Sequence, residues 1–201
     1  VGRGPIAGPV NACGVKFSHE DQGVLKKLVE LNVTDSKKLT KKKREKILNH
    51  LNINISELSL NTVYYNNVLG AQFSYCITEH DHGEIDQMNI LAASLSAMKK
   101  ASDFLGIEDT KILIDGNKAF ETSAEIETIV KGDSKVLAIA LASIIAKVFR
   151  DEKMKAFDKL YAGYNLAKHA GYPTKEHRDA VKKLGPSPIH RKSFKGVREY
   201  I

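Results

Sequence analysis

The spacing of apolar residues along the chain predicts a mixed α/β protein. Short alternating or continuous apolar runs predict strands at Val10 to Phe17, Gln72 to Thr78, Lys111 to Ile114 and Ile126 to Val130. Apolar residues three and four apart predict helices at Lys41 to Leu51, Ile85 to Leu105, Val136 to Leu160 and Lys175 to Leu184. The order of these elements in the middle of the chain indicates parallel strands joined by crossover helices.

The length of 201 residues gives room for one substantial core with an appended lobe, which residues 161–201 are expected to form. No run of about 18 apolar residues is present, so we expect no membrane partner. The first residues lack the pattern of a secretory signal, and the only two cysteines, Cys13 and Cys76, are far apart in sequence. These features favour a reducing compartment, the cytoplasm.

Positive charge gathers in two clusters. Lys and Arg number 31 against 24 Asp and Glu, a net charge of +7, and the surplus lies at Lys37 to Lys46 and Lys182 to Arg198. A single cluster of this kind is usually a solvated face. Two clusters together favour a polyanionic partner, because such surfaces neutralise phosphates and release counterions.

Two aspartates follow predicted strands. Asp115 ends the run KILID and precedes a glycine, and Asp133 stands in a similar place after the next strand. Ligands of open α/β sheets bind at such strand ends. A turn residue at Asp115 and a helix N-cap at Asp133 are the alternatives, and for Asp115 alone the two interpretations are about equal.

A third acid, Asp151, lies on the long predicted helix, with Ser143 and Lys147 one or two turns before it on the same face. Three carboxylates could converge on hard cations such as Mg²⁺ and stabilise the attacking water and leaving oxygen of phosphodiester hydrolysis. An ion pair of Asp151 with Lys147 or Lys155 is the competing interpretation.

Other constellations carry less weight. The stretch Glu79 to Asp86 is rich in acids and histidines, but it lies where a helix begins, a place that attracts acids without any metal. No phosphate-binding GxxxxGK[ST] motif occurs, and neither cysteine has a histidine close in sequence. Nucleotide triphosphate chemistry and a thiol nucleophile therefore have no support.

Eight motifs in one order resemble the bacterial ribonuclease HII family, the type 2 ribonucleases H. They are GRGPIAGPV from Gly2, DSKKL from Asp35, EIDQMNIL from Glu84, LIDGN from Leu113, IVKGD from Ile129, ASIIAKVFRD from Ala142, HAGYPTKEH from His169 and LGPSPIHRKSF from Leu184. The resemblance runs through essentially the whole chain. A single motif of this length would be a weak signal, whereas eight in order are specific.

The resemblance implies a ribonuclease H-like α/β fold, with a mixed five-stranded sheet flanked by helices. It implies a catalytic domain at residues 1–160 and a small C-terminal helical extension at 161–201. It also implies an endonuclease that acts as a monomer with Mg²⁺ or Mn²⁺. The implied substrates are RNA in RNA/DNA hybrid duplexes and single ribonucleotides embedded in duplex DNA.

The resemblance also implies roles for particular residues. Asp115 would be a metal ligand and Asp133 a further active-site acid. The backbone of Gly2, Arg3 and Gly4 would read the ribose 2′-hydroxyl, Tyr172 would stack on the sugar at the RNA–DNA junction, and Lys37 would contact a phosphate. Apart from the resemblance, we expect Asn117, Ser143, Lys147 and Asp151 to support this site; the resemblance adds little for Asp151, which we expect to be a structural or supporting acid.

One departure from the family pattern affects the expected activity. In the family an Asp-Glu pair ends the central first strand directly before the position of Val1, where this sequence begins. We therefore expect that the sequence lacks that strand and two of four acids, and that a molecule consisting of these residues alone would fold poorly and not cut. A non-catalytic hybrid-binding module and another nuclease or transposase of the same fold remain the alternatives.

Overall fold

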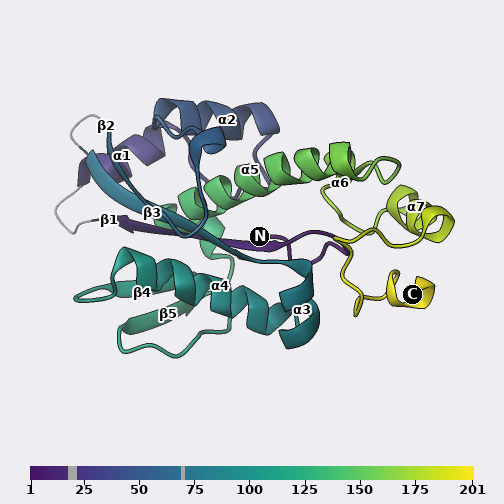
Figure 1. Cartoon of the computed structure of the whole chain (residues 1–201). Coiled ribbons are helices and arrows are strands. Elements are labelled where there is room, and N and C mark those ends of the chain that lie inside the picture. Colours follow the sequence, from purple (N-terminus) through teal and green to yellow (C-terminus); the bar gives the residue numbers. More distant parts are fainter. Residues whose placement is uncertain (18–21, 69–70) are drawn as a thin grey trace. The chain divides into compact units, whose positions relative to one another are not determined.

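The structure is a computed structural model that describes residues 1–17, 22–68 and 71–201 (Figure 1). The strands are β1 Val10–Phe17, β2 Val63–Val68, β3 Ala71–His80, β4 Lys111–Asp115 and β5 Glu125–Ile129. The α-helices are α1 Gln22–Glu30, α2 Lys41–His50, α3 His82–Met88, α4 Ile90–Leu105, α5 Leu137–Leu160, α6 Leu166–His169 and α7 Lys175–Leu184. Three short 3₁₀ helices are η1 Ile55–Glu57, η2 Gly132–Ser134 and η3 Arg198–Tyr200. The α/β class is confirmed.

The chain divides into two compact units. Unit 1 comprises residues 1–11, 79–94 and 149–201, and unit 2 comprises residues 12–78 and 95–148. Because each unit is assembled from separate stretches of sequence, a composition shift along the chain could not have located them. The division into residues 1–160 and 161–201 stays a prediction.

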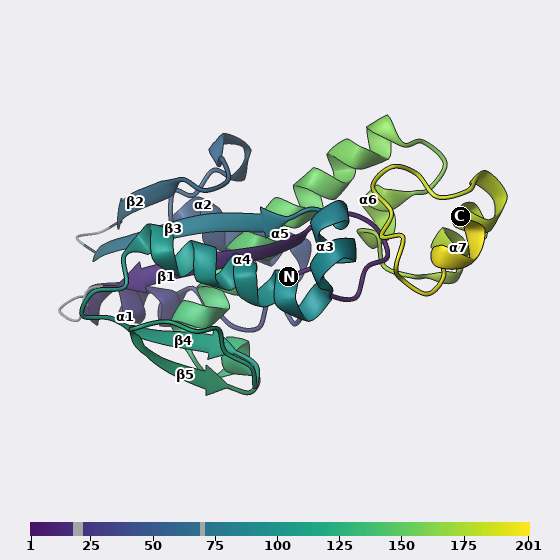
Figure 2. The same cartoon turned by 60° about the horizontal axis from the view of Figure 1, so that its bottom comes forward.

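The described residues form five strands, as expected, but these strands make two sheets instead of one. The larger sheet has the order β1-β3-β2, in which β2 and β3 are antiparallel, and the smaller sheet pairs β4 with β5 in parallel. Figures 1 and 2 show β4 and β5 side by side. The parallel pairing agrees with the prediction, whereas the connection between these strands, residues 116–124, contains no helix.

In unit 2, helices cover both faces of the larger sheet: α2 and the first half of α5 lie on one side and α4 on the other (Figures 1 and 2). The inward face of α5 carries buried residues at helical spacing, among them Leu141, Ile144, Ile145 and Val148. Helix α2 begins directly after Thr40, whose side chain caps it by accepting a hydrogen bond from the Lys43 backbone N–H.

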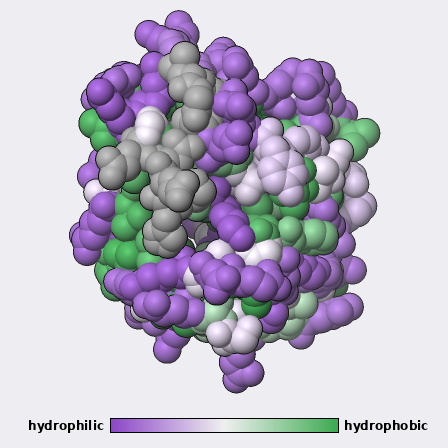
Figure 3. Space-filling model, turned by 90° about the vertical axis from the view of Figure 1, so that its left-hand side faces the viewer, coloured by the Kyte–Doolittle hydropathy of each residue, from purple (hydrophilic) through white to green (hydrophobic). Residues whose placement is uncertain are grey.

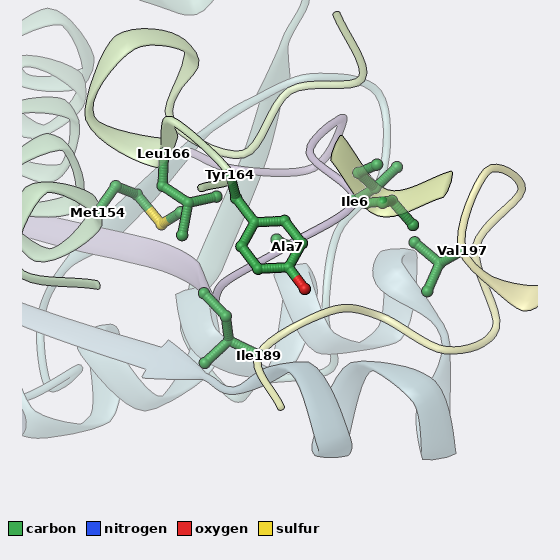
Figure 4. Packing of buried hydrophobic residues seen from close by; sticks show 8 residues of the cluster. Ile6, Ala7, Met154, Tyr164, Leu166, Ile189 and Val197 are labelled. Atoms are coloured by element: carbon green, nitrogen blue, oxygen red, sulfur yellow. The ribbon is translucent and has the colours of Figure 1, made fainter. Parts of the chain in front are cut away.

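The core of unit 1 joins segments from both ends of the chain. Figure 4 shows this packing, in which Ile6 and Ala7 of the N-terminal segment meet residues of the second half of α5 and of the C-terminal region. The buried residues of this cluster are Ile6, Ala7, Met154, Tyr164, Leu166, Val181, Ile189 and Val197. The N-terminal segment is therefore fixed by hydrophobic burial against residues more than a hundred positions away in sequence.

The prediction of one continuous helix from Ile85 to Leu105 is wrong. It is two helices, α3 and α4, separated at Asn89, whose φ is 73°. The Asn89 Oδ1 atom accepts hydrogen bonds from the backbone N–H groups of Leu91 and Ala92, so this residue ends one helix and caps the next. The apolar spacing continues through the break, which is why the pattern did not reveal it.

Helix α3 begins with a capping box. Asp81 accepts from the Glu84 backbone N–H at 2.9 Å, and Glu84 accepts from the Asp81 backbone N–H at 2.9 Å. His80 Nδ1 also contacts the Glu84 carboxylate at 2.8 Å, and the pKa of Glu84 is lowered by these hydrogen bonds and the His80 charge against the opposing effect of burial. Helix capping thus accounts for Asp81 and Glu84, while Glu79 bonds Asn11 and Asp86 accepts from Ser193.

Hydrophilic residues dominate the face of the molecule that Figure 3 shows, with smaller apolar areas between them. Among the helices of residues 1–17, 22–68 and 71–201, none is both long enough and apolar enough to cross a membrane.

Candidate active site

In unit 2 the end of β4 exposes a carboxylate beside a turn. Asp115 is the last residue of β4 and lies opposite Ile129 in the parallel register. The Gly116 backbone N–H continues this pairing by donating to the Ile129 carbonyl at 3.0 Å. The Asp115 side chain is exposed, and its Oδ1 atom accepts a hydrogen bond from the Gly132 backbone N–H at 2.8 Å. The two strand ends are therefore joined through this carboxylate.

The turn after β5 can approach Asp115 because it contains a glycine. A Cβ atom on Gly132 would lie 2.7 Å from Ile139 Cδ1 and 3.5 Å from Asp115 Oδ1. Lys131, directly before it, adopts the left-handed conformation with φ 57° and ψ 43°. Helix η2 starts at Gly132 and places Asp133 next to Asp115.

Asp133 is buried, with 6% of its surface exposed, although it is a carboxyl group. Burial raises its pKa, and the nearby carboxylates of Asp115 and Asp35 raise it further, whereas the Lys37 ammonium acts in the opposite direction. Asp35 also shares a side-chain hydrogen bond with Asp133. Asp35 and Asp115, from distant parts of the sequence, are thus both close enough to Asp133 to raise its pKa.

The sequence pattern assigns no role to Asp35, and the one signal that points to it is its place at the head of the motif DSKKL, beside Lys37. The Asp35 side chain accepts from the Lys37 backbone N–H at 2.9 Å, and its carbonyl accepts from the Lys38 backbone N–H at 2.9 Å. This tight turn presents the Asp35 carboxyl group to Asp133, and Lys37, which is exposed, extends from the same turn.

The segment that carries Asp35 is held by two interactions within unit 2. Arg44 Nη1 donates to the carbonyls of Ser36 and Leu39, both at 2.7 Å. The hydroxyl groups of Ser36 and Ser143 lie 2.8 Å apart, which gives Ser143 a contact that positions this segment. Arg44 belongs to the first basic cluster but is only 9% exposed, so it does not contribute to a charged surface.

The other predicted supporting residues lie in different settings. Asn117 is exposed, two residues beyond Asp115. Lys147 and Asp151 are half-buried and engaged in interactions. Asp151 belongs to unit 1, where its carboxylate favours the charged form of the neighbouring Arg150.

In unit 1 the N-terminal loop, residues 2–9, wraps around the buried guanidinium groups of Arg150 and Arg191. Arg191 donates to the carbonyls of Gly2 at 2.7 Å, Pro5 at 2.8 Å, Gly8 at 2.9 Å and Pro9 at 3.1 Å, with a longer contact of 3.4 Å to Arg3. Arg150 donates to the carbonyls of Ala7, Pro9 and Ala170 at 3.1, 3.0 and 2.8 Å. The loop carbonyls consequently turn inward.

Both guanidinium groups are fully buried, although Arg191 lies in the second basic cluster. Burial lowers the pKa of Arg191 to about 9, assisted by the nearby Arg150 charge, and burial lowers the pKa of Arg150 to about 10. The expectation that the clustered cations form polyanion-binding surfaces therefore does not extend to Arg44 and Arg191, which hold backbone carbonyls instead.

The amides of the same loop face no partner. Within the part of the chain that the structure describes, the backbone N–H groups of Gly2, Arg3 and Gly4 donate no hydrogen bond. Tyr172, which is 40% exposed, packs its ring on Gly4, where a Cβ atom would lie 3.2 Å from Tyr172 Cε1. Gly2 has φ 89°, and a Cβ there would lie 2.5 Å from Arg150 Nε. The loop thus combines free donors with an adjoining aromatic ring.

Asp35, Asp115 and Asp133 form what we call the carboxyl cluster. Its chemistry suits a hard cation, since all of its donors are oxygen atoms and their charges repel one another. Among the residues that the structure describes, however, no group of three or more His, Cys, Asp or Glu is arranged to hold a metal ion. This applies to the Glu79 to Asp86 stretch as well.

The chain is similar to known ribonucleases over nearly its whole length. The family model for ribonuclease HII matches residues 1–197. Ribonuclease HII from Francisella tularensis subsp. mediasiatica is 41% identical over 197 residues, covering 98% of this chain and 92% of the relative. The protein from subsp. novicida is also 41% identical, with 94% of the relative covered.

Solved structures have the same fold. Ribonuclease H2 from Pyrococcus horikoshii superimposes with a TM-score of 0.69 at 23% identity, covering 100% of this chain and 93% of that one. Ribonuclease HII from Archaeoglobus fulgidus, solved in complex with PCNA, gives a TM-score of 0.69 at 20% identity, covering 97% and 92%.

The fold and these relatives define the class of the protein: it is a ribonuclease H, an endonuclease among the hydrolases. Within that class, the chain belongs to the ribonuclease HII family.

Proposed function

We propose that the protein cuts RNA in RNA/DNA hybrids and at ribonucleotides embedded in duplex DNA, leaving 3′-hydroxyl and 5′-phosphate ends. The observation that carries the proposal is the meeting of Asp115, Asp133 and Asp35 at the ends of β4 and β5, beside the exposed Lys37. Family membership supports the reaction class, and the carboxyl cluster supplies the place for it.

Asp115 and Asp133 would hold Mg²⁺ or Mn²⁺, because carboxylate oxygens are the ligands that such hard cations prefer. Asp35 is a further carboxyl group within reach of Asp133. When bound, the cation supplies an activated water and stabilises charge on the phosphate. The Gly132 amide keeps the Asp115 carboxylate in place, and Lys37 neutralises a phosphate of the substrate strand.

Recognition of RNA would rest on the N-terminal loop. The free amides of Gly2, Arg3 and Gly4 are hydrogen-bond donors suited to a ribose 2′-hydroxyl, the group that DNA lacks. The exposed face of the Tyr172 ring provides a stacking surface for the sugar at the RNA–DNA junction. We further propose that the protein acts as a monomer in the cytoplasm, where its two thiols, Cys13 and Cys76, stay free.

The test uses the full-length natural protein and a DNA duplex that carries one ribonucleotide. We expect a single nick that requires Mg²⁺ or Mn²⁺. Asp115→Asn removes a ligand charge with little change of volume, so cutting should fall by more than the roughly 10- to 100-fold that loss of a group bonded to a metal ligand costs, while duplex binding persists. Asp103→Asn, the same change at an exposed α4 residue paired with Lys99 at 2.8 Å, is the matched control and should cut normally.

The outcomes separate the alternatives. Binding without any metal-dependent nick by the natural protein would favour a hybrid-binding module. Equal cutting of an all-DNA duplex would favour another nuclease of the same fold. Retained cutting by Asp115→Asn would remove Asp115 from the proposed site.

A further inference from the structure

Three histidines gather in the interior of unit 1, next to the segment that carries Tyr172. The rings of His169 and His177 stack with centroids 4.4 Å apart, and His177 Nε2 lies 3.0 Å from His190 Nε2. His177 and His190 are fully buried. None of these rings takes part in the chemistry proposed above, so their arrangement requires a separate explanation.

The groups at the two ends of this chain of contacts have a fixed polarity. At one end, the Ser187 backbone N–H donates to His190 Nδ1 at 3.0 Å, and the Ser187 hydroxyl lies 2.8 Å from the same atom. At the other end, the Tyr172 carbonyl lies 2.9 Å from His177 Nδ1 and can only accept. A backbone N–H and a carbonyl cannot exchange these roles.

The fixed ends set the tautomer of each ring. His190 Nδ1 accepts, so a neutral His190 carries its proton on Nε2 and donates it to His177 Nε2. His177 then carries its proton on Nδ1 and donates it to the Tyr172 carbonyl. Burial lowers the pKa of both rings to about 4, which keeps them neutral at ordinary pH. Each hydrogen bond from Ser187 through His190 and His177 is therefore donated in the direction of the Tyr172 carbonyl.

The Tyr172 backbone groups make their other hydrogen bonds to nearby residues, and the preceding Gly171 carbonyl accepts from the Ile6 backbone N–H at 2.9 Å. The Tyr172 backbone N–H donates to the His169 carbonyl at 2.9 Å, and the Tyr172 carbonyl also accepts from the Thr174 backbone N–H at 2.8 Å. The Tyr172 ring lies on Gly4 of the N-terminal loop. His177 is thus a buried side chain that bonds the carbonyl of Tyr172, the residue whose ring lies on Gly4.

We propose that His177, fixed in one tautomer by His190 and Ser187, is a positioning residue for Tyr172 and thereby a determinant of how well the protein distinguishes a ribonucleotide from a deoxyribonucleotide. This inference rests on the proposed function of Tyr172 and the N-terminal loop. The inference adds to that function a relay of buried hydrogen-bonding groups, Ser187, His190 and His177, which would act on Tyr172 without touching the substrate.

Two variants of the same residue separate the contacts of His177. His177→Asn keeps an N–H donor near the Nδ1 position and loses the contact to His190. His177→Gln keeps an amide near the Nε2 position and loses the donor to the Tyr172 carbonyl. The measurement is the ratio of Kd values for an all-DNA duplex and a duplex with one ribonucleotide, taken without divalent metal so that no cutting occurs.

We expect His177→Gln to lower this ratio roughly tenfold, as one lost buried hydrogen bond would, and His177→Asn to retain most of it. Tyr172→Ala should lower the ratio by itself, and adding His177→Gln to it should change nothing more, because the two act through one ring. Equal ratios for His177→Gln and the natural protein would overturn the proposal. So would additive losses in the double variant, which indicate a merely structural role.

A second measurement does not depend on substrate. Nitrogen NMR of the natural protein near neutral pH reports which ring nitrogen carries the proton. We expect the Nδ1–H tautomer for His177 and the Nε2–H tautomer for His190, and any other pair of states would overturn the relay. If the natural protein showed no preference for a ribonucleotide while the tautomers were as expected, the proposed function and the specificity role of His177 would both fail, and only the fixed tautomers would stand.

Discussion

Lowering the pH should destabilise the protein through His177 and His190 before its carboxylates titrate. Both rings have an ordinary pKa of 6.5 that burial lowers to about 4 in the folded protein, and each ring's charge would also repel a neighbouring histidine. The unfolded chain therefore binds protons as the pH falls through 6.5, whereas the folded protein does not bind them until about pH 4. The stability contributed by the neutral rings is complete above pH 6.5 and is lost as the pH falls toward 4.

The size of this effect follows from the two pKa values. One pKa unit corresponds to about 1.4 kcal/mol. At about pH 5 the unfolded histidine is roughly 1.5 units below its pKa of 6.5, so each ring costs about 2 kcal/mol and the pair about 4 kcal/mol. Since domains are stable by only about 5–15 kcal/mol, this loss should be easy to measure.

The assay is urea unfolding at several pH values between about 7.5 and 5. The control is a double variant, His177→Asn with His190→Gln, which has no ring to titrate at either position. Effects of other histidines and of carboxylates are common to both proteins and cancel in the comparison. The reasoning would be refuted if the natural protein lost no more stability over this range than the double variant does.

Three further predictions concern the structure around the site and the helix break. Gly132→Ala should cost about 1–3 kcal/mol of stability because its Cβ would lie 2.7 Å from Ile139 Cδ1, and adding Ile139→Val, which lacks that atom, should recover most of the loss in urea unfolding. Asn89→Ala should cost about 1–2 kcal/mol and Asn89→Gly clearly less, because only glycine tolerates the φ of 73° without a cap; equal melting temperatures would contradict this. Ser36→Ala and Ser143→Ala should each cost about 1 kcal/mol, and the double variant less than their sum, whereas additive losses would show that the 2.8 Å contact contributes nothing.

Some elements of the fold could be predicted to the residue. Strand β1 and helix α7 have the predicted bounds, Val10–Phe17 and Lys175–Leu184, because Gly, Pro and capping residues mark their ends. Strand β2, Val63–Val68, was not predicted, since its sequence VYYNNV combines strand-forming residues with asparagines that usually mark turns. Helix α1, Gln22–Glu30, was also missed. Local sequence signals identify an element only when its ends and its interior agree.

The candidate site was predictable only where its residues follow apolar strands. Asp115 and Asp133 stand out for that reason. Asp35 lies in an irregular segment, about 80 positions before Asp115 and 98 positions before Asp133 in sequence. Only the folded chain brings it to Asp133. The burial of Arg44 and Arg191 could not be predicted from the sequence either, because nothing in a run of cations indicates which side chain will bond backbone carbonyls.

The hydrogen bonds from Arg191 to the N-terminal loop affect when that loop can fold during synthesis, because the ribosome makes the loop before Arg191. The guanidinium of Arg191 bonds the Gly2 carbonyl across 189 positions and the Gly8 carbonyl across 183. The loop of residues 2–9 leaves the ribosome long before Arg191 is added, so it lacks this internal scaffold through much of synthesis. Contacts of such long range form late and slowly. A nascent chain that has not yet reached Arg191 therefore carries the loop sequence without the loop conformation, so the proposed ability to recognise a ribonucleotide should arise only after Arg191 has been added.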